Sequence, residues 1–207
     1  MRIGVLASGR GSNLQALIDS WKEGTLGGEL VAVGSDHAEA QALQRGREAG
    51  IPYQAFPLYD YASRREQEEA ILHWLLEQKV ELLLLAGFMR VLSKEFLQNL
   101  QIPVLNIHPS LLPAFPGLHA QRQALEYGVK ITGCTVHFVD EGLDSGPIVL
   151  QAAVPVLPED TEDSLSGRIL QVEHRLYPEA VRLVASGRIK REGRLVVNTE
   201  DRFHPII

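Results

Sequence analysis

The sequence predicts an α/β fold with a doubly wound, mostly parallel sheet, a mixed or antiparallel C-terminal portion and one long C-terminal helix. Three observations carry this prediction. In the first half, short apolar runs alternate with longer amphipathic runs, the order that builds parallel strands joined by helices. In the second half, two β-rich runs at residues 131–140 and 146–156 enclose one glycine-bracketed loop. A continuous helical pattern then covers residues 161–187.

The length and composition suit a globular protein with one domain, or with one domain and a small appendage. The chain has 207 residues, of which 45% are hydrophobic and 22% charged, and a chain of this size can bury a proper core. The net charge is −6 and no basic stripe is present, which argues against a general nucleic-acid binder. No apolar run approaches the ~20 residues that span a bilayer. The N-terminus resembles a strand rather than a signal peptide, and a single cysteine, Cys134, fits a reducing cytoplasm.

The elements of the first half are predicted from hydrophobic periodicity and from helix end signals. Apolar runs predict strands at residues 2–7, 29–35, 52–56, 80–88 and 102–107. Helical spacing predicts helices at residues 12–24, 38–50, 63–79 and 93–99. The run at residues 80–88 is almost entirely apolar, as expected for a strand that is buried on both faces.

The sequence pattern of the second half predicts an arrangement different from the alternating strands and helices of the first half. Its two β-rich runs form a hairpin-like pair with an unusually long connecting loop. Thr161 is the predicted N-cap of the long helix, and Pro178 lies inside that helix, where a proline kinks the axis. Short apolar runs at residues 188–190 and 193–198 predict two small terminal strands.

A glycine-rich loop, ASGRGSNL, follows the first strand and opens the first helix. Its glycines allow close approach of the backbone, and the free N–H groups at the positive end of the helix make a natural anion site. A dinucleotide fingerprint needs a third glycine where Leu14 stands, although Asp36 does follow the second strand. No lysine stands where a P-loop requires it. A single phosphate monoester therefore fits better, and a plain strand-to-helix turn is the alternative.

Two polar residues, Asn106 and His108, stand two apart at the end of the fifth predicted strand. Side chains two apart point the same way, so we expect both to face one space at the carboxyl end of the sheet, where open α/β sheets bind ligands. An amide N–H and an imidazolium N–H converging there would stabilise an oxyanion. The alternative is a turn cap beside an ordinary loop histidine. Prolines at positions 109, 113 and 116 stiffen the following loop, which favours a fixed site.

Asp144 lies in the glycine-bracketed loop, in the sequence DEGLDSGP. A carboxylate beside a histidine favours the imidazolium, so a contact with His108 would prepare that histidine as a general acid. Aspartate is also common in turns, and spacing alone does not place it beside His108. Metal-ligand spacing is missing among His108, His119 and His137, and no G-x-S-x-G elbow is present. His137 alternates with apolar residues and is interpreted as structural.

Four segments carry a resemblance to a known family. They read VLASGRGSNLQALID, LLLAGFMRVLS, LNIHPSLLPAFPGLHAQRQAL and GCTVHFVDEGLDSGPIVLQ. In this order and spacing they resemble the phosphoribosylglycinamide formyltransferases, a branch of the folate-dependent formyltransferase family. The resemblance covers residues 2–190 and implies a Rossmann-like fold. It also implies transfer of a formyl group from the co-substrate 10-formyltetrahydrofolate to the amine of phosphoribosylglycinamide in purine synthesis, with no metal.

The resemblance implies roles by position. It implies that Asn106, His108 and Asp144 are the catalytic residues. The residues that it implies for binding are Gly11, Ser12, Asn13 and Glu173 for phosphoribosylglycinamide, and Arg64, Met89, Arg90, Val91, Leu92, Asn106, Asp140, Glu141, Gly142, Leu143 and Asp144 for the folate. Arg10 departs at a position that the family varies; we expect it to point to solvent, and a contact with the phosphate is the alternative.

The resemblance also implies an organisation and a setting. Residues 1–190 would form one formyltransferase domain, with a phosphate-binding half at 1–100, a catalytic and folate-binding half at 101–190, and a tail at 191–207 without a predicted role. Its partners would be small-molecule substrates, without nucleic acid or membrane, in a cytoplasmic monomer or homodimer. A formyltetrahydrofolate hydrolase or a methionyl-tRNA formyltransferase is an alternative that would need a further domain. A non-catalytic folate or nucleotide sensor would not need the three catalytic residues together.

Overall fold

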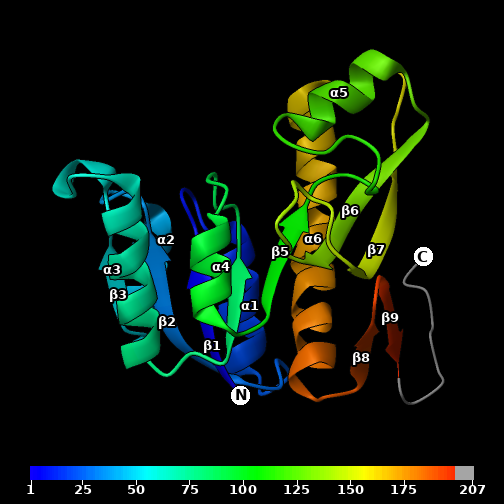
Figure 1. The fold of residues 1–207 in the computed structure, drawn as a ribbon. Helices are drawn as coiled ribbons and strands as arrows, with labels where there is room; N and C mark the ends of the chain where they lie inside the picture. The colour runs from blue at the N-terminus through cyan, green and yellow to red at the C-terminus, as the bar shows by residue number, and fades with distance from the viewer. Residues whose placement is uncertain (199–207) are drawn as a thin grey trace. The chain divides into compact units, whose positions relative to one another are not determined.

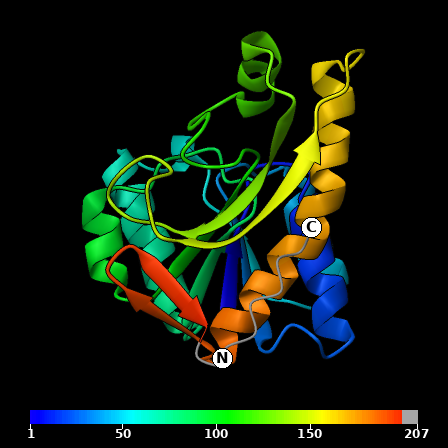
Figure 2. The same ribbon diagram turned by 90° about the vertical axis from the view of Figure 1, so that its right-hand side faces the viewer.

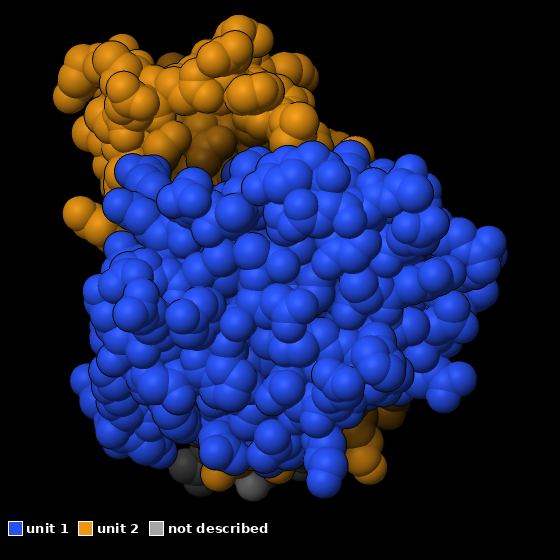
Figure 3. All heavy atoms as spheres, turned by 90° about the vertical axis from the view of Figure 1, so that its left-hand side faces the viewer, with its two compact units in different colours: residues 1–105 blue, residues 106–207 orange. Residues whose placement is uncertain are grey.

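The computed structural model describes residues 1–198, and the chain forms two compact units (Figure 3). Residues 1–105 make up the first unit and residues 106–207 the second. The chain passes from one unit into the other within a single strand, β5 (Val104–His108). The part of the predicted tail beyond residue 198 lies outside the described residues. None of the described helices is both long enough and apolar enough to cross a membrane.

The first unit contains four parallel strands in the order β3-β2-β1-β4 (Figure 1). They are β1 (Arg2–Leu6), β2 (Glu29–Ser35), β3 (Tyr53–Ala55) and β4 (Leu82–Leu85). All four residues of β4 are buried, as the continuous apolar run predicts. Burying a leucine side chain contributes roughly 1.5–3 kcal/mol, so this central strand anchors the core of the unit.

Helices cover both faces of these four strands, which confirms the predicted doubly wound arrangement. Figure 2 shows α1 and α2 on one face and α3 and α4 on the other, and each pair is in contact. The helices are α1 (Ser12–Lys22), α2 (Gln41–Glu48), α3 (Arg64–Glu77) and α4 (Lys94–Leu100), with a short 3-10 helix, η1 (Leu58–Asp60), before α3. Ser63, the first residue of the helix predicted at 63–79, caps α3, because its hydroxyl accepts a hydrogen bond from the Glu66 N–H at 3.2 Å.

The second unit combines antiparallel strands with a long helix, as predicted. Strands β6 (Ile131–Phe138) and β7 (Ile148–Pro155) pair antiparallel, and α6 (Glu162–Ala185) packs along both. The terminal strands β8 (Ile189–Glu192) and β9 (Leu195–Asn198) form a second antiparallel hairpin. One helix was not predicted, α5 (Ala120–Tyr127), which ends at Gly128 in the left-handed conformation.

The long helix α6 has the predicted N-cap, Thr161, and contains Pro178 in its interior, as predicted. The Thr161 hydroxyl accepts a hydrogen bond from the Ser164 N–H at 3.2 Å, and the Ser164 hydroxyl bonds to the Thr161 backbone in return. Pro178 lies inside the helix without ending it. Figure 2 shows the two halves of α6 inclined to each other, as expected where a proline removes one backbone hydrogen bond.

The start of α6 is tied to the preceding loop by one carboxylate. Both oxygens of Asp160 accept hydrogen bonds from the Arg168 guanidinium at 2.7 Å, and the Leu157 N–H and the Ser164 hydroxyl donate at 2.7 and 2.8 Å. These donors favour the ionised form. The Arg168 guanidinium in particular holds the pKa of Asp160 well below its ordinary value.

Replacing Asp160 by asparagine tests this anchor. Because the pKa of Asp160 is lowered in the folded state, its ionised form contributes stability above the ordinary carboxyl pKa and loses that contribution as the pH falls below it. We expect Asp160→Asn to lower Tm at pH 7, and the gap between the two proteins to shrink below about pH 4. Thermal unfolding followed by circular dichroism measures both. A gap that stays constant or widens in acid would show that the charge of Asp160 is not what anchors the helix.

Candidate active site

The glycine loop of the first unit leads into α1, and no side chain caps the N-terminus of this helix. Gly11 is the N-cap of α1 in the left-handed conformation, φ +66°. A Cβ atom at Gly11 would lie 2.9 Å from the Cα of Ala42, so α2 leaves room only for glycine. Ser12 and Asn13 follow as the first residues of the helix. The loop therefore presents backbone N–H groups at a positive helix end, as an anion requires.

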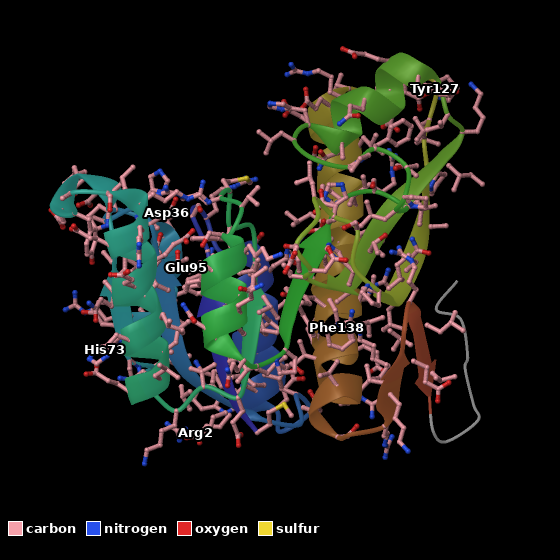
Figure 4. All side chains as sticks on the ribbon, in the orientation of Figure 1. Arg2, Asp36, His73, Glu95, Tyr127 and Phe138 are labelled. Carbon is pink, nitrogen blue, oxygen red and sulfur yellow. The ribbon has the colours of Figure 1, made fainter. Side chains whose placement is uncertain are left out.

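Two other residues near this loop bear on the kind of anion. Arg10 is exposed, and its carbonyl accepts a hydrogen bond from the Arg45 Nε at 2.9 Å. Asp36, labelled in Figure 4 at the end of β2, keeps only 4% of its side chain exposed and lies 3.0 Å from the Nδ1 of His37. A buried carboxylate in that position is not open to a ribose, which favours a phosphate monoester over a dinucleotide.

The segment at residues 87–93, which joins β4 to α4, lies beside the glycine loop within the first unit. The Ser8 N–H donates to the Gly87 carbonyl at 3.1 Å, and the Ser8 hydroxyl accepts from the Met89 N–H at 2.9 Å. The structure thus brings together the implied phosphate loop and part of the implied folate set. Met89 and Val91 expose their apolar side chains, whereas Leu92 is buried.

Two arginines of the implied folate set attach to α3. Arg90 donates from Nη1 to the Gln67 Oε1 at 2.7 Å, and Arg64, itself on α3, donates from Nε to the Glu68 Oε1 at 3.3 Å. Gln67 and Glu68 were not singled out from the sequence, because the run SRREQEE looks like a solvated helix face. Their burial appears only once α3 is packed.

In the second unit, four polar side chains gather around the end of β5. Asp144 Oδ2 lies 3.4 Å from the Nδ1 of His108, and its Oδ1 lies 3.7 Å from the Nε2 of His137. The Nδ2 of Asn106 is 3.3 Å from the same His137 nitrogen. The structure therefore brings together Asn106, His108 and Asp144, and it adds His137 as a fourth member.

Asp144 is held in place by the backbone. Its φ of +48° is unusual for a residue with a side chain, and its Oδ2 accepts a hydrogen bond from the Gly117 N–H at 2.7 Å. The loop before it is closed by Asp140, whose Oδ1 accepts from the Gly142 N–H at 3.0 Å and from the Ser145 hydroxyl at 2.7 Å. The carboxylate of Asp144 is thereby fixed between the proline-rich loop and the two imidazoles.

The hydrogen bonds of His108 distinguish its two ring nitrogens. Its Nε2 lies 2.8 Å from the Phe115 carbonyl, which can only accept, so Nε2 carries a proton and donates. The other nitrogen, Nδ1, faces Asp144. Because Nε2 is hydrogen-bonded to the loop, Nδ1 is the nitrogen of His108 that remains available for other contacts.

His137 has the opposite arrangement. Its Nδ1 lies 3.0 Å from the Phe138 carbonyl and must donate to it. The residue is buried, and burial lowers the pKa of His137 from its ordinary value. A neutral ring protonated at Nδ1 accepts at Nε2, which directs the NH2 group of Asn106 toward it. The sequence could not reveal this role, since a buried histidine in a strand looks the same whether it fills a core or borders a site.

Of the other predicted residues of this unit, Glu141 and Leu143 are exposed in the loop before Asp144, and Glu173 is a buried carboxylate on α6. Burial and, to a smaller extent, Glu173 raise the pKa of the Cys134 thiol to about 12. The cysteine is therefore a neutral thiol near pH 7 and not a nucleophile. Within residues 1–198 no group of three or more histidine, cysteine, aspartate or glutamate side chains could hold a metal ion.

Comparisons with known proteins give similarities over almost the whole chain. A model of the formyl transferase family matches residues 1–181. The trifunctional purine biosynthetic protein adenosine-3 of Drosophila melanogaster is 50% identical over 188 residues, which are 90% of this chain and 14% of that protein. This chain thus spans about 14% of the length of that curated relative.

Proteins of similar length match as well. The phosphoribosylglycinamide formyltransferase of Escherichia coli K12 is 45% identical over 190 residues, which are 92% of this chain and 90% of that one. The crystal structure of glycinamide ribonucleotide transformylase 1 from Symbiobacterium toebii superposes with a TM-score of 0.93 at 53% identity, and the match covers 96% of this chain and 93% of that one. These similarities agree with the resemblance seen in the sequence and with the predicted fold class.

The state of His137 can be measured directly. We expect it to be neutral and protonated on Nδ1 at pH 7, with a titration midpoint below the ordinary 6.5, because burial disfavours the charged ring. Long-range ¹H–¹⁵N correlation spectra across pH 5–8 report both the tautomer and the midpoint, and His137→Gln assigns the signals. A midpoint above 6.5, or a ring protonated on Nε2, would contradict the hydrogen bond to Asn106 described above.

Proposed function

The chain belongs to the formyl transferase family, and we propose that it transfers a formyl group from 10-formyltetrahydrofolate to the amine of phosphoribosylglycinamide in purine biosynthesis. The observation that carries this proposal is the cluster in which Asp144 lies 3.4 Å from the Nδ1 of His108 and Asn106 bonds to His137. The similarity to the Escherichia coli enzyme, which covers 90% of that protein, supports the choice of substrates.

The binding roles form part of the proposal. The phosphate binds to the backbone N–H groups of Gly11, Ser12 and Asn13, and Glu173 meets the ribose. The folate is held by Arg64, by residues 89–92 and by residues 140–145. The exposed side chains of Met89 and Val91 support this assignment, because they offer apolar surface to the flat ring system of a folate.

The chemistry follows from the donors in the cluster. The amine attacks the formyl carbon, and the carbonyl oxygen becomes an oxyanion that accepts hydrogen bonds from the Asn106 amide and from the Nδ1–H of His108. As the intermediate collapses, the bond from carbon to the folate nitrogen breaks and the new amide remains. The proton lost by the amine passes to the leaving nitrogen, and Asp144 stabilises the imidazolium during this transfer.

The reaction in this proposal is direct and forms no covalent intermediate on the protein. Cys134, the only cysteine, has a pKa raised to about 12 and is buried, so it supplies no thiolate. Much of the rate acceleration then comes from holding two substrates in line, an effect worth roughly 7–11 kcal/mol in favourable cases.

The proposal also covers organisation and setting. Residues 1–190 act as one formyltransferase domain, with a phosphate-binding half at 1–100 and a catalytic and folate-binding half at 101–190, and residues 191–207 form a tail. The protein acts on small molecules in the cytoplasm, as a monomer or homodimer, without a metal, nucleic-acid partner or membrane partner.

A radiolabelled formyl group tests the proposed reaction. The purified full chain is incubated with 10-[¹⁴C]formyltetrahydrofolate, with and without phosphoribosylglycinamide, and the products are separated. We expect label on the amine at the rate at which tetrahydrofolate appears, and little turnover without the amine. Labelled formate released without the amine would identify a hydrolase instead. Absence of turnover in both reactions would contradict an enzymatic function and favour a sensor.

A further inference from the structure

Two neighbouring polar residues of α3 are buried in the first unit. Gln67 is 1% exposed and Glu68 is 9% exposed, although the three residues that precede them in α3 are polar and exposed. Burying a carboxylate is costly unless it is fully hydrogen-bonded. The hydrogen-bond partners of Gln67 and Glu68 therefore indicate the role of these two buried side chains.

Glu68 joins two parts of the implied folate set. Its Oε1 accepts hydrogen bonds from the Arg64 Nε at 3.3 Å and from the Ser93 N–H at 3.2 Å, and its Oε2 accepts from the Ser93 hydroxyl. Ser93 ends the segment at residues 87–93 and caps α4, since its hydroxyl accepts from the Phe96 N–H at 3.1 Å. One carboxylate thus fixes Arg64 relative to the segment that contains residues 89–92.

Gln67 attaches the same segment at a second point. Its amide nitrogen donates to the Phe56 carbonyl, which sets the orientation of the amide. The oxygen then faces Arg90 and accepts from its Nη1 at 2.7 Å. At its start the segment is held by Ser8, through the hydrogen bond from the Met89 N–H. The segment is therefore attached at Met89, Arg90 and Ser93.

We propose that Glu68, supported by Gln67, is a positioning residue for the folate co-substrate. It sets the distance between Arg64 and residues 89–92 without itself touching the ligand. This inference rests on the proposed function, because that function makes both groups folate contacts. Charge-assisted hydrogen bonds to a buried carboxylate are stronger than neutral ones and hold their donors in fixed directions.

The same helix offers a matched control. Glu69 pairs with Arg65 at 2.9 Å with the same spacing of four residues, but the two side chains are 58% and 70% exposed. Arg65 also contacts Glu95, labelled in Figure 4 on α4, at 3.2 Å. Exposed pairs of this kind contribute little. Glu69→Gln therefore removes one carboxylate from α3 without disturbing the segment at residues 87–93.

The experiment compares Glu68→Gln with Glu69→Gln in the full-length protein. We expect Glu68→Gln to raise KM for 10-formyltetrahydrofolate about tenfold, which corresponds to about 1.4 kcal/mol. KM for phosphoribosylglycinamide and kcat should change less than twofold, and Glu69→Gln should match the unchanged protein. Equal KM values for the folate in the two variants would overturn the proposal. So would a loss of Tm and kcat in Glu68→Gln with both KM values unchanged, which would indicate a purely structural carboxylate.

Binding of tetrahydrofolate by calorimetry separates this inference from the proposed function. If the unchanged protein binds tetrahydrofolate but transfers no formyl group, the proposed function fails, and a tenfold higher Kd in Glu68→Gln still supports the positioning role. If the unchanged protein does not bind tetrahydrofolate, the inference is overturned. Should Glu68→Gln not fold, Gln67→Leu decides in its place, with a higher folate KM or Kd expected and an unchanged value contradicting the proposal.

Discussion

The carboxylate of Asp144 is the constraint on which the polar cluster of the second unit depends. It accepts a hydrogen bond from the Gly117 N–H, lies beside the Nδ1 of His108 and is 3.7 Å from the Nε2 of His137. The backbone adopts a left-handed φ to bring it there, a conformation that costs on the order of 1 kcal/mol or more for a residue with a side chain. Such strain persists only where the surrounding contacts hold the residue, and here the loop at Gly117 and the strands β5 and β6 do so.

Two histidines beside one carboxylate acquire different properties from their other hydrogen bonds. The Nε2–H of His108 donates a hydrogen bond to the Phe115 carbonyl, and Nδ1 faces Asp144. The Nδ1–H of His137 donates to the Phe138 carbonyl, and burial lowers the pKa of His137. The Nδ1 of His108 therefore faces Asp144, whereas the Nε2 of His137 faces the NH2 group of Asn106. The backbone carbonyl beside each ring sets which nitrogen carries the proton, and burial lowers the pKa of His137.

The sequence predicts the parts of this arrangement that depend on local periodicity. Strand alternation puts Asn106 and His108 on one face, and a glycine-rich turn opens α1 at its positive end. The contact between His108 and Asp144 depends on how two loops close, which no local pattern encodes. Helix α5 was not predicted, because it is only eight residues long and buries only two alanines, so its apolar face gives a weak periodic signal in the sequence. The burial of Glu68 was missed because charged runs in helices are usually solvated.

If His108 and Asp144 act as one unit in the proposed formyl transfer, a double-mutant cycle on kcat will show that their effects are coupled. His108→Ala and Asp144→Asn are each expected to lower kcat by about 10²–10³, as loss of one oxyanion donor or its support does. Combined, they should lower kcat little further than the slower single variant, because the second change removes a group whose partner is already gone. Losses that multiply in the double variant, with folding intact, would show that the two residues act independently and would contradict the account.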